Sequence, residues 1–272
     1  MYEIEVAAYE DRLEEFATNY EEDFGVTFGE RPNVTVANAK DYRSYLEDLG
    51  RESGLDLGSS EELDMMAQSM YYQAMGMYDD INHQVLISDY VIGGDDDVDQ
   101  GLVDYVLAHE LVHAYQHNQG NTMSTVELSK EIDKRFGTTE DLQTQLLAAT
   151  WSFPVMAIAE GQAEYMSINM LKEHAADNER NAAAWEAASE KYQDGYVGAK
   201  EYYRENIEAL VEVEERAKRG EVGFMDMFIL GQIKMAQYVL GIGYIEDVVE
   251  RNGTTMDELL ENGPETLSDF LK

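Results

Sequence analysis

The sequence predicts an α+β fold that is predominantly helical and carries a small β-sheet. Two observations lead to this prediction. Hydrophobic residues recur at helical spacing along most of the chain, beginning with Ile4 and Leu13. By contrast, residues 71–78 and 84–88 have the composition of strands and flank a polar segment at 79–82, which predicts a hairpin.

The N-terminal part is expected to combine helices with one further strand. Helical spacing covers residues 2–20, and the β-branched run at 34–36 predicts a short strand. A second helix is expected at 41–49, ending before Gly50, and a third begins near Ser60.

After an acidic loop at 93–99, the helical pattern continues to the end of the chain without a repeat or a low-complexity linker. A chain of 272 residues is long enough to bury a large core. We therefore expect a single domain covering 1–272, with an N-terminal α/β lobe of about 1–118 and a helical lobe of about 119–272.

The composition excludes several functional classes. Fifty-six Asp and Glu against 19 Lys and Arg give a formal charge of −37, which disfavours nucleic acid and anionic lipid as partners. A content of 44% hydrophobic residues excludes an unfolded acidic tail. The evenly spread acids resemble the hydrated surface of proteins from halophiles. Attraction of cationic ligands is the alternative explanation.

The location of the protein is predicted from what the sequence lacks. Without cysteine, the chain has no disulfide, thiolate nucleophile or cysteine-bound metal. The longest uncharged run, 142–159, contains glutamines and Pro154, which favours a buried helix over membrane insertion. No signal peptide is visible, so we expect a cytoplasmic protein, unless the chain is a trimmed part of an exported one. No partner protein is identifiable.

The motif that carries chemistry is His109-Glu110-Leu111-Val112-His113. Residues four apart lie on one face of a helix, so the two imidazoles can bind one metal ion. Glu110 stands where its carboxylate can reach a water on that metal. The alternative is a pair of histidines that only pack in a buried helix.

A catalytic zinc site needs a third protein ligand. Gln116 stands where a local extension of the motif would need glycine, and His117 lies too far along the helix to close on the same ion. A distant carboxylate fits better. We therefore assign Glu160 to the metal, and we expect Glu164 to fix the tautomer and orientation of a ligand histidine. A solvated acidic helix face is the alternative.

The motif His109-Glu110-x-x-His113, followed by Glu160-Gly161-x-Ala163, resembles the gluzincin branch of zinc metallopeptidases. The resemblance covers about residues 75–262. It implies a zincin-like fold, in which a small mixed sheet packs on the motif helix and the active site lies between the lobes. It further implies Zn²⁺ on His109, His113 and Glu160, Glu110 as the catalytic base, and peptide hydrolysis by a metal-activated water.

Further details follow from the same resemblance. The hairpin is similar to the strands that hold a substrate in this family, which implies a peptide antiparallel to the strand near 85–88. Residues 228–231 and 241–244 resemble the family's Tyr-x-x-Gly helix and its glycine turn. Because Phe228 stands where an oxyanion-donating tyrosine is common, Tyr238 is the candidate donor.

Some features depart from the family or point elsewhere. Residues 73–77 lack the glutamate that holds a substrate amine in aminopeptidases, which favours an endopeptidase. Residues 119–148 form an apparent insertion, with an expected helix at 122–136. The aspartates at 95–99 lack the remaining residues of a calcium loop, so we expect a solvated loop in which Asp99 caps the motif helix.

Within enzymes, a different hydrolase that uses the same metal site stays open, and so do two other functional classes. One is a catalytically inactive zinc-binding fold with a binding or regulatory role. The other is an acidic surface that buffers cations, which predicts many weak metal sites and no effect of changing His109.

Overall fold

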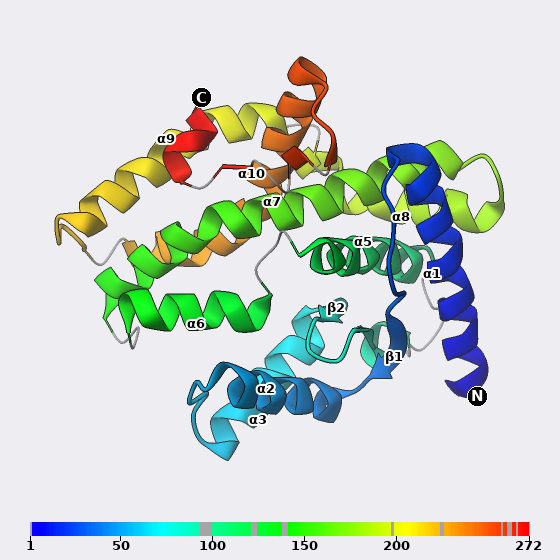
Figure 1. Cartoon of the computed structure of the whole chain (residues 1–272), viewed down its shortest axis with the longest axis horizontal. Coiled ribbons are helices and arrows are strands. Elements are labelled where there is room, and N and C mark those ends of the chain that lie inside the picture. Colours follow the sequence, from blue (N-terminus) through cyan, green and yellow to red (C-terminus); the bar gives the residue numbers. More distant parts are fainter. Residues whose placement is uncertain are drawn as a thin grey trace. The chain divides into compact units, whose positions relative to one another are not determined.

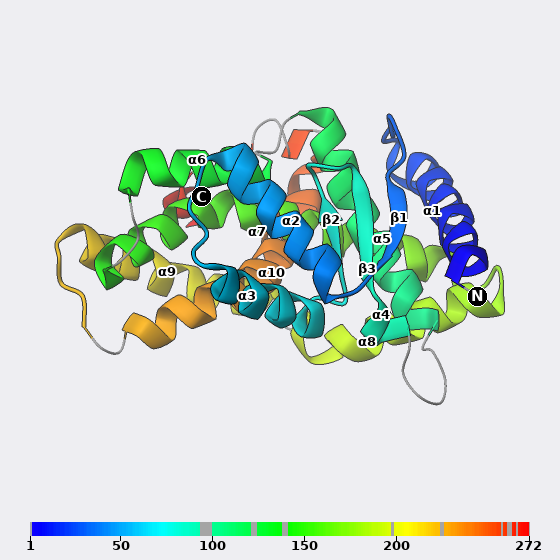
Figure 2. The ribbon, with the colours of Figure 1, turned by 90° about the horizontal axis from the view of Figure 1, so that it is seen from below.

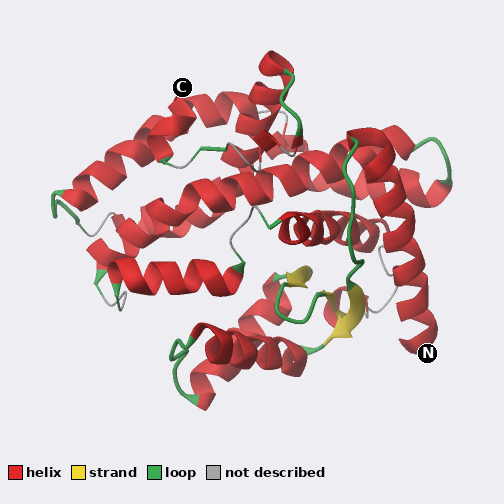
Figure 3. Cartoon of the chain, viewed as in Figure 1, coloured by secondary structure: helices red, strands yellow, loops and turns green. Residues whose placement is uncertain are grey.

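The computed structural model describes residues 2–92, 100–120, 124–137, 141–196, 199–223, 226–256, 258–259, 263–264 and 266–271. In these residues the protein is predominantly helical with one small mixed sheet, which confirms the predicted balance of helix and strand (Figures 1 and 3). The elements in chain order are α1 (Tyr2–Phe24), β1 (Asn33–Ala37), α2 (Ala39–Ser53), α3 (Ser60–Gln73), β2 (Gly76–Asp79), β3 (Gln84–Ser88), α4 (Asp89–Ile92), α5 (Gln100–Gln119), α6 (Thr125–Phe136), α7 (Leu142–His174), α8 (Glu179–Tyr196), α9 (Ala199–Lys218), α10 (Asp226–Asn252) and the 3₁₀ helix η1 (Leu267–Leu271).

The chain groups into two compact units, which are described separately below. Unit 1 contains Met1–Gly120, Ser124–Glu127 and Met166–Lys191. Unit 2 contains Leu128–Tyr165 and Tyr192–Lys272. The single domain with a lobe boundary near residue 118 stays a prediction.

Capping side chains set the starts of two helices in unit 1. At α2, the Asn38 side chain accepts a hydrogen bond from a helix N–H, and the Asp41 carboxylate accepts one from the Asn38 N–H. Ser59 and Glu62 form the same reciprocal pair at α3. Such boxes satisfy N–H groups that lack partners inside the helix.

The predicted end of α2 is wrong. The helix continues through Gly50 to Ser53, and Gly54 ends it in the left-handed conformation with φ of 75°. Glycine adopts this conformation without a steric penalty, and its N–H closes the last turn on the Gly50 carbonyl. Of the two glycines, the second has the conformation that stops a helix.

The sheet has the strand order β1-β3-β2 (Figure 2). Strand β3 lies in the middle, parallel to β1 and antiparallel to β2. The predicted hairpin is confirmed, but its first strand is shorter than expected, because residues 71–73 belong to α3. The Asp79 carboxylate fixes the turn by accepting the N–H groups of Ile81 and Asn82, each at 3.0 Å.

The two faces of the sheet pack against different helices (Figure 1). On one face, Leu86 and Met77 pack with Tyr42 and Tyr45 of α2, in a core that α3 completes. On the other face, β2 and β3 contact α5. Gly76 permits this contact, because a Cβ at that position would overlap the Val106 side chain of α5.

Helix α5 is buried on nearly all sides. Fourteen of its 20 residues are buried, including both polar and apolar positions. It packs on α1 as well as on the sheet. Since an unsatisfied polar group in such surroundings is costly, each polar side chain of α5 needs a partner.

A buried ion-pair network attaches α5 to α1 and α8. Asp104 is fully buried and accepts two hydrogen bonds from Arg180, at 2.7 and 2.6 Å, and one from Arg12 at 3.0 Å. Arg12 is itself buried, donates to Asn181 and lies over the Phe16 ring at 4.1 Å. The Asp104 carboxylate raises the pKa of Arg180. Each buried charge of the network is therefore stabilised by hydrogen bonds to more than one partner.

Unit 2 is built from helices, with a core formed by α7, α9, α10 and η1. Helices α7 and α10 cross with their backbones in contact, because Gly161 meets Gly241 and neither position has room for a Cβ. The predicted glycine turn at 241–244 is wrong, because these residues lie inside α10.

Two predicted features fall outside the described residues. The first is the acidic loop at 93–99, together with the proposed helix cap at Asp99. The second is Thr122, the first residue of the helix expected at 122–136; α6 is the described part of that helix. No helix in the described part of the chain is both long and apolar enough to cross a membrane.

We predict that Asp104→Asn lowers the free energy of unfolding by about 3–5 kcal/mol, because it removes the buried negative charge that Arg12 and Arg180 share and leaves Arg12 only the more exposed Glu15 as a partner. Chemical denaturation at fixed KCl concentration measures this change. The control is Glu47→Gln, which breaks the exposed pair with Arg43 and should cost less than about 1 kcal/mol. Equal losses in the two variants would contradict a structural role for the network.

Candidate metal centre

The two histidines of the motif bring their ring nitrogens together on α5. His109 Nε2 and His113 Nε2 lie 3.2 Å apart. Two imidazole nitrogens bound to one tetrahedral zinc ion, at Zn–N distances of about 2.0–2.1 Å, are separated by about 3.3 Å. The observed separation therefore matches that of a pair of zinc ligands.

Glu160 completes a group of three ligands. The candidate ligand atoms of His109, His113 and Glu160 all lie within 4.8 Å of one another, and the group could hold a metal ion. His109 and Glu160 are buried, and His113 is half-buried. Glu160 lies on α7, a continuous helix that runs on into Met166–His174 of unit 1. The three residues assigned to the metal from the sequence are thus close enough to share one ion.

Gln116 lies against the His113 ring and was not predicted as a functional residue. Its Oε1 lies 2.9 Å from His113 Nδ1, and the Gln116 side chain is buried. In this orientation the amide oxygen can accept a hydrogen bond from His113 Nδ1, and that arrangement leaves the Nε2 lone pair available. This is the state in which an imidazole binds a metal. The spacing of three residues along a helix was the signal available in the sequence.

The Glu110 carboxylate is buried and oriented by the sheet. Its Oε2 accepts a hydrogen bond of 2.8 Å from the backbone N–H of Tyr78 in β2. Gly76, two residues earlier, brings β2 close enough to α5 for this contact. A main-chain donor was not predicted, because side-chain patterns in the sequence do not show where a strand directs its N–H groups.

The position of β3 corrects the expected binding strand for a peptide. Strand β3 pairs along its length with β1 and β2, so a peptide cannot add to residues 85–88. Strand β2 has the sheet on one side only, and its Tyr78 N–H points away from β3 towards Glu110. The outer edge of β2 is therefore the sheet edge beside the motif.

Other residues named from the sequence lie as follows. Glu164 is buried on α7, one turn after Glu160. Tyr238 is half-buried on α10. His117 is outside the group of candidate ligands, and its ring instead packs on Tyr78 at 5.8 Å. The roles assigned to Glu164 and Tyr238 stay predictions.

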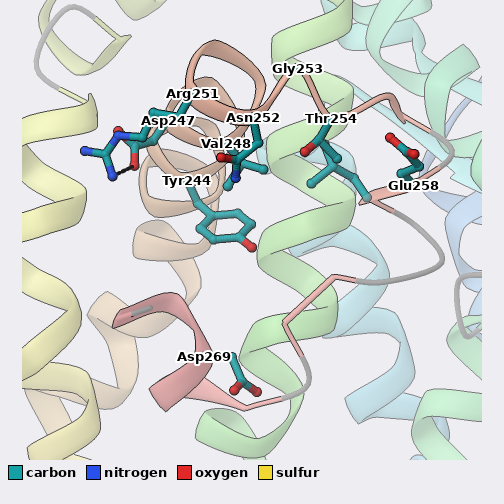
Figure 4. A pocket seen from close by; sticks show the side chains of 10 residues that line it. Tyr244, Asp247, Val248, Arg251, Asn252, Gly253, Thr254, Glu258 and Asp269 are labelled. Atoms are coloured by element: carbon teal, nitrogen blue, oxygen red, sulfur yellow. Dashed lines mark ion pairs between the residues drawn. The ribbon is translucent and has the colours of Figure 1, made fainter.

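Unit 2 also contains a polar cavity of about 670 Å³ at the end of α10 (Figure 4). Its lining includes Tyr244, Asp247, Arg251 and Glu258. Arg251 pairs with Asp247 at 2.9 Å, and Glu258 accepts the N–H and hydroxyl of Thr255. None of the candidate metal ligands lines this cavity, so it is separate from the metal centre.

Comparison of the chain with models of protein families, with curated proteins and with solved structures gives no match. The chemistry of the centre therefore has to be inferred from its own residues.

We predict that Gln116→Leu weakens zinc binding about 10- to 100-fold, because the variant no longer fixes the His113 tautomer. Competition with a chromogenic chelator measures the affinity. Gln119→Leu, an exposed change near the end of the same helix, is the matched control and should leave it unchanged. Equal affinities of wild type and Gln116→Leu would show that Gln116 does not orient the ligand.

Proposed function

We propose that the protein is a zinc metallopeptidase of gluzincin type that hydrolyses internal peptide bonds. The observation that supports this most strongly is the grouping of His109, His113 and Glu160 beside the buried carboxylate of Glu110. Two imidazoles and one carboxylate are a donor set found in catalytic zinc sites of peptidases. A structural zinc site usually uses four protein ligands, which favours the catalytic assignment.

Zinc fits the donor atoms present. The separation of the two Nε2 atoms, the contact of His113 Nδ1 with the Gln116 amide oxygen and the buried Glu160 carboxylate all suit this ion. When bound, zinc polarises a carbonyl group and makes water a stronger acid at neutral pH.

Glu110 is the proposed general base. It takes a proton from the attacking water and passes it to the leaving amine. The Tyr78 N–H holds its Oε2, so the carboxylate has one fixed orientation, and Oε1 is the oxygen assigned to proton transfer. Burial keeps competing bulk water away from this carboxylate.

Two further assignments complete the proposal. Because Gln116 already binds His113 Nδ1, we assign Glu164 to His109, the other ligand imidazole. Tyr238 remains the proposed donor to the oxyanion, since Phe228 has no hydroxyl to offer.

The substrate is proposed to be a peptide or protein that adds to the outer edge of β2. An extended chain in this position would pair with the outer-edge main-chain groups of β2 other than the Tyr78 N–H, which Glu110 already accepts. The absence of an amine-binding glutamate at 73–77 favours cleavage within a chain over removal of its first residue. A cytoplasmic location and adaptation to concentrated salt stay predictions based on composition.

We predict that Glu110→Gln lowers the rate of casein hydrolysis in molar KCl by about 10²–10⁴-fold, because the amide cannot accept the proton. Zinc content should stay that of the wild type. Glu61→Gln, at an exposed position of α3, is the control and should cleave at the normal rate.

A Glu110→Gln protein that cleaves as fast as the wild type would remove Glu110 from the mechanism. A wild-type protein that binds one zinc but cleaves no peptide from a broad library would instead favour the alternative, an inactive zinc-binding fold.

A further inference from the structure

Three tyrosines of unit 1 form an exposed aromatic surface, here called the tyrosine cluster: Tyr71, Tyr72 and Tyr90. Their ring centroids lie 4.9, 5.4 and 6.1 Å apart, and all three pairs meet edge to face. Tyr72 is 62% exposed and Tyr90 is 58% exposed. Large aromatic side chains grouped on a surface in this way are typical of a place where another molecule binds.

The cluster lies at the end of the β2–β3 hairpin where β2 begins. Ser88, the last residue of β3, connects its parts. The Ser88 hydroxyl donates to the Tyr71 carbonyl and accepts the Tyr90 N–H, while the Ser88 N–H donates to the Met75 carbonyl. Met75 precedes the first residue of β2. A chain extended along β2 therefore reaches the cluster just beyond Gly76.

The cluster belongs to an acidic stretch of the chain. No lysine or arginine occurs between Arg51 and Lys130, a stretch that holds 15 acidic residues. Within the cluster, the Tyr71 hydroxyl donates to the Asp89 carboxylate at 2.6 Å, and this hydrogen bond raises the pKa of Tyr71 to about 12. The hydroxyl therefore stays a donor, and a carboxylate stays fixed beside the rings.

We propose that the tyrosine cluster is a subsite that takes the side chain of a lysine or arginine of a polypeptide lying along β2. The claim that the subsite selects substrates rests on the proposed peptidase function. The claim that it binds a cationic side chain does not depend on that function. The expected substrates are then basic polypeptides, cleaved near a cationic residue.

The chemistry of the cluster favours a cation over an apolar side chain. The face of an aromatic ring carries negative charge density and attracts ammonium or guanidinium groups. The Asp89 carboxylate adds to this attraction, whereas it would oppose burial of an aliphatic side chain. Arginine also stacks on aromatic rings through its planar group.

The experiment must separate the cluster from the general attraction of a chain with charge −37. At 1 M KCl, electrostatic interactions through solvent are screened within about 3 Å, but direct contact of a cation with a ring remains. The probe is a fluorescent ten-residue peptide with one arginine, compared with the same peptide carrying citrulline. Anisotropy measures binding to full-length Glu110→Gln protein, which leaves the peptide intact.

We expect the arginine peptide to bind about tenfold more tightly than the citrulline peptide. A Tyr72→Leu/Tyr90→Leu protein should lose this preference, and Tyr72→Phe/Tyr90→Phe should keep most of it, because the rings remain. Met65→Leu/Met66→Leu alters exposed residues earlier on α3 and is the matched control. Equal binding of the two peptides to protein with intact tyrosines, or a preference that survives Tyr72→Leu/Tyr90→Leu, would overturn the proposal.

Failure of the two proposals gives different results. If the wild type hydrolyses no peptide but the cluster still selects arginine, the subsite stands as a binding site and the peptidase function falls. If the wild type cleaves peptides with no dependence on arginine or on the cluster, the subsite falls and the peptidase function stands.

Discussion

The burial of α5 is the constraint on which the site and much of unit 1 depend. This helix carries His109, Glu110 and His113 inside the protein, where an unsatisfied polar group would be costly. The described structure satisfies several such groups with partners that also set geometry. Asp104 accepts hydrogen bonds from two arginines, Glu110 accepts one from the Tyr78 N–H, and His113 Nδ1 lies against the amide oxygen of Gln116. The contacts that stabilise the helix therefore also orient the residues proposed for catalysis.

The sequence predicted features that depend on local periodicity and side-chain type. These include the motif helix, the hairpin, the strand at 34–36 and the three residues that group as candidate metal ligands. The sequence did not predict features that depend on contacts between distant parts of the chain. The central position of β3 follows from its pairing with β1, which no local pattern encodes. The Tyr78 N–H was not predicted as the partner of Glu110, because a main-chain donor has no residue signature. The end of α2 was placed at Gly50 instead of Gly54, because only backbone conformation distinguishes the two glycines.

Negative charge has two different roles in this chain. Most of the 56 acidic residues are consistent with a hydrated surface suited to concentrated salt. A few carboxylates are buried, among them Asp104, Glu110, Glu160 and Glu164. Burial of a carboxylate is expensive, so these positions are where cations or strong donors are expected. For Asp104 the cations are arginines, and for Glu160 we propose zinc.

Zinc content per chain tests the central claim most directly. Wild type, His113→Ala and Glu160→Ala are dialysed in molar KCl against a weak chelator, zinc is measured by mass spectrometry, and the donor atoms are examined by X-ray absorption. We expect one zinc per wild-type chain with two imidazole nitrogens among its ligands, and loss of the metal in both variants. A wild type without tightly bound zinc, or a Glu160→Ala protein that keeps its zinc fully, would contradict a zinc site made by His109, His113 and Glu160.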